Sequence, residues 1–131
     1  MEDKIIDFLK NKYNPIAIYL FGSYSKGNMT YDSDIDISIL LNNITVNASN
    51  LFDSAQELAA IIGYDVDLIN YLTAPLALKI QILQNKRVIY CNDNEKRLFN
   101  EMITLSLYQK LNEERALILE NEFGANVWKL F

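Results

Sequence analysis

A polar stretch at residues 22–36 separates two apolar runs, and it constrains the fold more than any other feature of the sequence. The runs at 16–21 and 37–41 are short and apolar, which is typical of buried β-strands. The stretch between them opens on a Gly-Ser pair and closes on an Asp-x-Asp pair formed by Asp34 and Asp36. A turn and paired carboxylates between two strands predict a site for a phosphate and a metal ion.

Each residue type in this stretch has a physical reason to stand where it does. Gly22 lets the backbone bend sharply and approach a ligand closely, because it has no Cβ. Ser23 can cap a following helix, whose free N–H groups favour a phosphate. Asp34 and Asp36 are two apart in a strand, so their carboxylates share one face and Ile35 points to the other. Two such carboxylates repel each other, and oxygen ligands of this kind suit Mg²⁺ bridging to substrate phosphates.

A second carboxylate pair lies in the predicted strand at 64–70. Asp65 and Asp67 alternate with apolar Val66 and Leu68. Because side chains alternate along a strand, both aspartates can face the side on which the first pair lies.

The spacing of these residues resembles the signature of the DNA polymerase beta-like nucleotidyltransferase superfamily. Gly22-Ser23 is followed by ten residues and then by Asp34-x-Asp36, with Ser33 before the first aspartate. The short chain and the Gly-Ser-x-x-x-Gly and Ser-Asp-Ile-Asp forms of the motif resemble its minimal nucleotidyltransferase branch. The specific similarity covers about residues 20–40 and 65–70.

The resemblance implies a role for each matching residue. Asp34, Asp36 and Asp67 would be the catalytic carboxylates and the ligands of Mg²⁺, two ions in all, with Asp67 favoured over Asp65 by its Val-Asp-Leu-Ile context. ATP would be the substrate, its phosphates received by Gly22, Ser23, Lys26 and Ser33. Lys26 stands where the family commonly has Arg. Three further cations, which could contact a triphosphate, are interpreted as solvated: Lys79, Lys86 and Arg87.

The resemblance also implies an acceptor, and here alternatives stay open. Members of this branch are often antitoxins of HEPN-domain ribonuclease toxins, so the expected reaction is transfer of AMP to a hydroxyl of the toxin, by expectation a tyrosine. One alternative is a small-molecule transferase of the aminoglycoside type, although this chain lacks the extra domain that holds the drug. The other is an antitoxin that only binds, with a vestigial site.

Composition limits the remaining possibilities. The chain has 131 residues, half of them hydrophobic, which suffices for one ordinary domain. A net charge of -5 and a pI near 4.6 argue against a direct nucleic-acid binder, which needs a basic surface. The absence of histidine excludes imidazole bases and zinc–histidine sites, so the chemistry must use carboxylates. A single cysteine and no apolar run long enough to span a membrane predict a cytoplasmic protein.

The expected fold is an α/β (α+β) domain, a small mixed β-sheet flanked by helices with a C-terminal helical extension. Apolar periodicity predicts helices at 2–12 and 75–84, a helix that begins at Asn50 or Asp53 and ends at Gly63, and a strand at 87–90.

A long helix is predicted from Asp93 onward, with an apolar face so broad that it should pack on the domain and on something else. We assign residues 1–111 to the nucleotidyltransferase domain. We assign 112–131 to a helical tail, whose apolar character predicts contact with the toxin or with a second copy of the chain.

Overall fold

The structure is a computed structural model, and it describes residues 1–22, 34–43 and 46–123. Its sheet has four strands in the order β3-β2-β1-β4. They are β1 (Ala17–Phe21), β2 (Ile35–Leu40), β3 (Val66–Asn70) and β4 (Arg87–Cys91). β1 pairs antiparallel with β2 and β4, whereas β2 and β3 are parallel. The predicted mixed sheet is thus confirmed.

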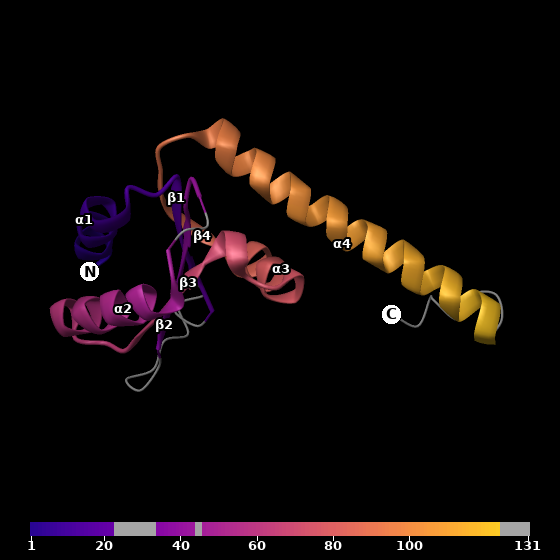
Figure 1. Ribbon diagram of the computed structural model, residues 1–131, viewed down its shortest axis with the longest axis horizontal. Coiled ribbons are helices and arrows are strands. Elements are labelled where there is room, and N and C mark those ends of the chain that lie inside the picture. Colours follow the sequence, from indigo (N-terminus) through magenta and orange to yellow (C-terminus); the bar gives the residue numbers. More distant parts are fainter. Residues whose placement is uncertain (23–33, 44–45, 124–131) are drawn as a thin grey trace.

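Helices cover both faces of this sheet (Figure 1). On one side α1 (Glu2–Tyr13) and α2 (Ala48–Ile62) pack on a core that includes the three β2 isoleucines. On the other side lie a 3₁₀ turn at Tyr71–Thr73, α3 (Leu76–Asn85) and α4 (Asn94–Phe123). This second core holds the alternate side chains of β1. The alternation of β1, β2 and β3 between the two cores fixes which face each aspartate occupies.

Local signals end the helices much as predicted, with one correction. The chain leaves α1 at Asn14 in the left-handed conformation, which asparagine tolerates, and it leaves α2 at Gly63 in the same conformation. The predicted start of α2 at Asn50 or Asp53 is wrong. The helix begins earlier, because the side chain of Asn47 caps it by accepting the backbone N–H of Asn50 at 2.7 Å.

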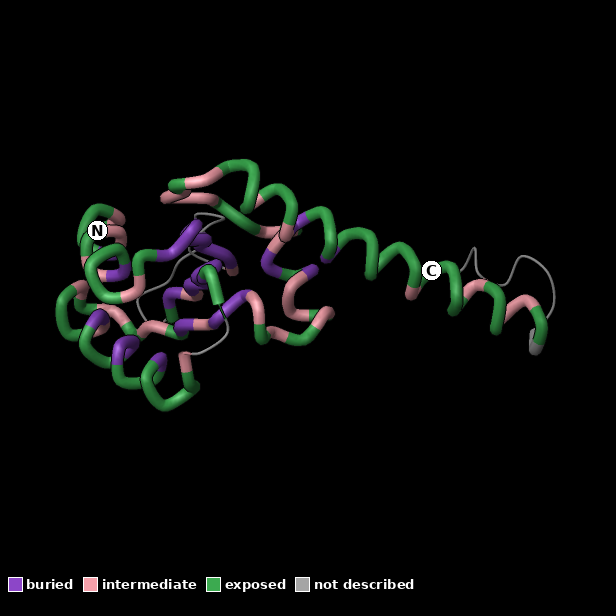
Figure 2. Tube along the Cα trace, turned by 45° about the horizontal axis from the view of Figure 1, so that its top comes forward, coloured by how far each residue is buried: buried purple, intermediate pink, exposed green. Residues whose placement is uncertain are grey.

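α4 is one continuous helix of 30 residues, about 45 Å long at the usual rise per residue. It passes without a break through the predicted boundary at residues 111 and 112. Its first turns lie against α3, and the remainder projects away from the domain (Figures 1 and 2). The predicted C-terminal helical extension is confirmed, and the division of the chain at residue 112 stays a prediction.

A buried polar cluster fixes the first half of α4 to the domain. The carboxylate of Glu101, which is only 4% exposed, forms ion pairs with Lys86 and with Arg97, the latter at 2.6 Å. One turn further on, the hydroxyl of Thr104 lies 2.5 Å from that of Tyr71. α4 therefore meets the domain through charge and hydrogen bonds.

No helix in the described part of the chain has the length and apolar character that a membrane crossing requires.

We expect Glu101→Ala to lower the free energy of unfolding by about 2–3 kcal/mol, because it leaves the half-buried Arg97 without its carboxylate. Urea denaturation measures this. The control is Glu57→Ala, which breaks the exposed Lys12–Glu57 pair and should cost at most about 1 kcal/mol. Equal losses of stability for the two variants would contradict the conclusion that Glu101 holds α4 on the domain.

Candidate active site

The sheet brings two of the predicted carboxylates side by side. Asp36 pairs with Phe21 of β1 on one side and with Asp67 of β3 on the other. Because Ile35, Ile37 and Leu68 fill the core under α1 and α2, Asp36 and Asp67 face the opposite side of the sheet. Asp36 is half-buried there, and Asp67 is exposed.

Asp34 completes an acidic edge at the start of β2. It is exposed and immediately precedes the strand. Burial, and after it the charges of Asp67 and Asp34, raise the pKa of Asp36 above its ordinary value of 3.8. Asp67 and Asp34 are thus each close enough to repel Asp36, and Asp36, the most enclosed of the three, bears the cost of that repulsion.

Gly22, which directly follows β1, lies against the acidic edge. It follows the strand with φ of +74°, a conformation that favours glycine. A Cβ at this position would collide with Oδ2 of Asp36 and lie 3.2 Å from its Cγ. The group that Gly22 approaches in the structure is the central carboxylate, and its predicted approach to a ligand stays a prediction.

The other predicted phosphate contacts, Ser23, Lys26 and Ser33, lie outside the described residues, as does the helix expected after Ser23. Asp65, the less favoured candidate, is exposed and precedes β3. Its backbone carbonyl accepts the N–H of Ile35 at 2.8 Å, which ties the two acidic strand ends together.

The cations interpreted as solvated are engaged elsewhere. Lys86 pairs with Glu101, and Arg87 pairs with Glu2 of α1. The ammonium of Lys79 lies 5.5 Å from the ring centre of Tyr71, which follows the far end of β3. Lys86 and Arg87 nevertheless remain exposed, so the interpretation as solvated holds for them, although each also pairs with a carboxylate elsewhere in the chain.

Among the described residues, no group of three or more carboxylate or cysteine side chains is arranged as a metal cage. Mg²⁺ seldom needs one, since it is commonly held by one or two carboxylates together with substrate phosphates and water. The hard oxygen donors and mutual repulsion of Asp34, Asp36 and Asp67 fit that mode of binding.

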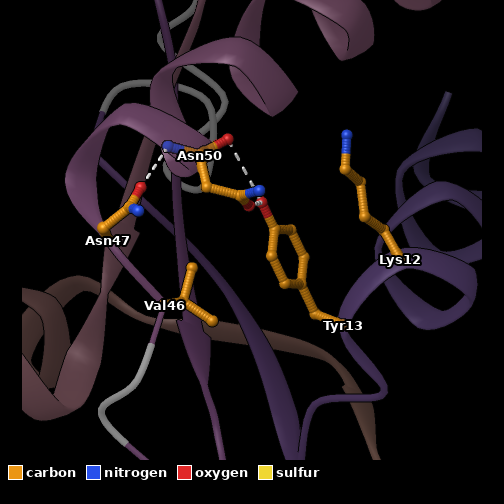
Figure 3. A pocket seen from close by; sticks show the side chains of 5 residues that line it. All are labelled: Lys12, Tyr13, Val46, Asn47 and Asn50. Atoms are coloured by element: carbon orange, nitrogen blue, oxygen red, sulfur yellow. Dashed lines mark hydrogen bonds between the residues drawn. The ribbon is translucent and has the colours of Figure 1, made fainter.

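A separate hollow of about 380 Å³ lies between α1 and the start of α2 (Figure 3). Its lining residues are Lys12, Tyr13, Val46, Asn47 and Asn50. The Tyr13 hydroxyl lies 2.5 Å from both Asn50 Oδ1 and Ser54 Oγ. Three of the lining residues come after the C-terminal end of β2, whereas Asp34 precedes its N-terminal end. The hollow is therefore remote from the acidic edge. No motif or spacing in the sequence indicates this hollow.

Comparison with known proteins places the chain in one family. The model of the family described as Polymerase beta, Nucleotidyltransferase matches residues 3–95. The chain therefore belongs to the polymerase beta nucleotidyltransferase family.

Individual relatives share most of its length. The chain is 35% identical over 121 residues to the protein adenylyltransferase MntA of Shewanella oneidensis, which covers 92% of this chain and 86% of the relative. A crystal structure described as a toxin–antitoxin with AMP-PNP is 35% identical, with a TM-score of 0.80 and coverage of 92% and 96%. A structure of the tri-AMPylated Shewanella oneidensis HEPN toxin in complex with MNT antitoxin matches at 33% identity and a TM-score of 0.73, with coverage of 92% and 93%.

The close approach at Gly22 gives a first test of the site. We expect Gly22→Ala to destabilise the fold by about 2–4 kcal/mol, because the left-handed strain adds to the collision with Asp36. Gly63→Ala is the matched control: its φ is +82°, but nothing lies within 4 Å of the added Cβ, so about 1–2 kcal/mol of strain alone is expected. Chemical denaturation compares the two, and a smaller loss at Gly22 would contradict the contact.

The raised pKa of Asp36 gives a second test. A carboxyl whose pKa is higher in the folded state binds protons more readily there, so stability falls as pH rises through that pKa. We expect Asp36→Asn to raise the melting temperature by about 2–4 °C at pH 7.

This gain should vanish below about pH 4, where Asp36 is protonated in the folded and the unfolded chain. Thermal melts between pH 3 and pH 8 measure it. A variant less stable than wild type at pH 7 would show that the ionised carboxylate stabilises the fold.

Proposed function

We propose that this protein transfers AMP from ATP to a tyrosine hydroxyl of a cognate HEPN toxin and thereby acts as its antitoxin. The observation that carries the proposal is the strand register that places Asp36 beside Asp67. Gly22 lies against Asp36, and Asp34 is close enough to affect its pKa. Relatives that share over nine-tenths of this chain support it, since one is a protein adenylyltransferase and others are seen with AMP-PNP or with an AMPylated toxin.

In this proposal Asp34 and Asp36 hold Mg²⁺, and Asp67 is a third ligand or the base. The bound metal would neutralise negative charge on the triphosphate and orient it for attack. The Gly22–Ser23 turn, Lys26 and Ser33 remain predicted phosphate contacts. Burial, and after it the charges of Asp67 and Asp34, raise the pKa of Asp36, and a cation at the acidic edge would relieve the part that is due to repulsion, which supports the metal assignment.

The reaction is an in-line displacement at phosphorus. The acceptor oxygen forms a bond to the α-phosphorus of ATP as the bond to the bridging oxygen of pyrophosphate breaks. The hydroxyl proton passes to a carboxylate, for which Asp67 is available because it is exposed beside Asp36. The products are an AMP ester of the acceptor and pyrophosphate. We place this activity in the cytoplasm, where ATP is supplied.

Mass spectrometry of the toxin tests the proposal. The cognate HEPN toxin is incubated with ATP, Mg²⁺ and either the wild-type protein or the Asp34→Ala/Asp36→Ala double variant. We expect a mass gain of one or more AMP groups with the wild type only, and we expect tandem fragmentation to locate the gain on tyrosine.

The matched control is Asp3→Ala/Asp7→Ala, which removes two aspartates from α1 and should leave transfer unchanged. If the toxin gains no mass with the wild type but is still neutralised by the Asp34→Ala/Asp36→Ala variant, the protein is an antitoxin that acts by binding alone.

A further inference from the structure

The first half of α4 has its polarity reversed relative to an ordinary surface helix. Such a helix turns apolar residues inward and polar residues outward. α4 instead turns Glu101 and Thr104 toward the domain, where they are 4% and 2% exposed. The apolar residues on the same turns are exposed, and most of α4 is coloured as exposed in Figure 2. The buried polar cluster therefore orients α4 so that its apolar face is exposed to solvent.

We define the α4 patch as the six large apolar residues that this arrangement exposes by 45–63%: Leu98, Phe99, Met102, Ile103, Leu105 and Leu107. Together they offer on the order of 500 Å² of apolar surface, at the upper end of what a monomer usually exposes in one patch. A specific interface buries about 800 Å² per partner, so the patch could form the greater part of one.

α4 lies almost entirely outside the catalytic family domain. The family match ends at residue 95, the second residue of the helix. The match to MntA spans 121 residues of the chain, so at least 26 of them, 121 less 95, lie beyond that point. The helix is therefore shared with MntA, and it lies almost wholly beyond the region matched by the family model, which holds the acidic edge.

Charge favours a different protein over a second copy as the occupant. Two copies of this chain would each bring a net charge of -5 to the contact. A ribonuclease must bind RNA and so presents basic surface, which complements an acidic antitoxin.

We propose that the α4 patch is the surface on which the HEPN toxin docks, so that the toxin is held by α4 while its acceptor hydroxyl is presented to the acidic edge. This inference rests on the proposed function for the identity of the partner. It adds that two different surfaces serve the two steps: the α4 patch binds the toxin, and the acidic edge of the sheet carries out AMP transfer. The patch should accordingly control the affinity for the toxin and leave the handling of ATP unchanged.

The test variant is Phe99→Glu/Met102→Glu, which changes the two most exposed patch residues, both 63% exposed. The matched control is Phe52→Glu/Gln56→Glu on α2, where Phe52 is 65% exposed and the same two charges are added. Calorimetry without ATP measures the affinity of each variant for the cognate HEPN toxin. AMP transfer is then followed against toxin concentration, and ATP affinity and melting temperature are measured in parallel.

We expect the patch variant to bind the toxin at least tenfold more weakly and to raise the KM for toxin by a similar factor. Its kcat, ATP affinity and melting temperature should match those of the control. Unchanged toxin affinity would overturn the inference, whether or not AMP is transferred. Conversion of a wild-type dimer to a monomer with unchanged toxin affinity would assign the patch to a second copy. Patch-dependent toxin binding without AMP transfer by the wild type would uphold the inference and reject the proposed function.

Discussion

The register between β1, β2 and β3 is the constraint on which the rest of the structure depends. A slip of one residue in β2 would turn its isoleucines toward α3 and α4 and bury Asp36 under α1 and α2. Burial of those isoleucines therefore specifies the register, and the register in turn places Asp36 beside Asp67. The position of the acidic edge is thus a consequence of apolar packing on the opposite face of the sheet.

The acidic edge costs stability, and the two cores offset that cost. Asp36 is held half-buried near two like charges, and the adjoining Gly22 occupies a backbone conformation that other residues rarely adopt. Neither feature stabilises the apo fold. Both are tolerated because β1 and β2 are packed on both faces, so the strand ends are fixed by contacts deeper in the sheet. A bound cation would remove part of the electrostatic cost.

Much of the fold follows from local signals, and the exceptions have long-range causes. Alternation predicted the strands, and Gly63 predicted the end of α2. The start of α2 was misplaced because Asn47, Asn50 and Asp53 are equally good caps in the sequence. The choice between them is made in three dimensions, where Asn50 contacts the hydroxyl of Tyr13 and Asn47 is left to cap the helix.

The same limit applies to the charged residues. Local spacing was enough to mark Asp34, Asp36 and Gly22 as candidate site residues. The partners of Lys86 and Arg87 could not, since Glu101 and Glu2 lie far away along the sequence. Glu101 itself gave a weak signal: it is a carboxylate beside apolar Met102 and Ile103, and such a residue is ordinarily taken as solvent-facing.

Burial of Glu101 explains why the apolar breadth of α4 was visible in the sequence although its orientation was not. Periodicity shows that apolar residues spread around much of the helix, but it cannot say which side meets the domain. The ion pairs of Glu101 with Arg97 and Lys86 settle the rotation, since a buried carboxylate needs its cations. Once α4 is turned that way, Phe99 and Met102 have no place in either core. The buried charge cluster between α4 and the domain thereby determines which apolar surface α4 exposes to solvent.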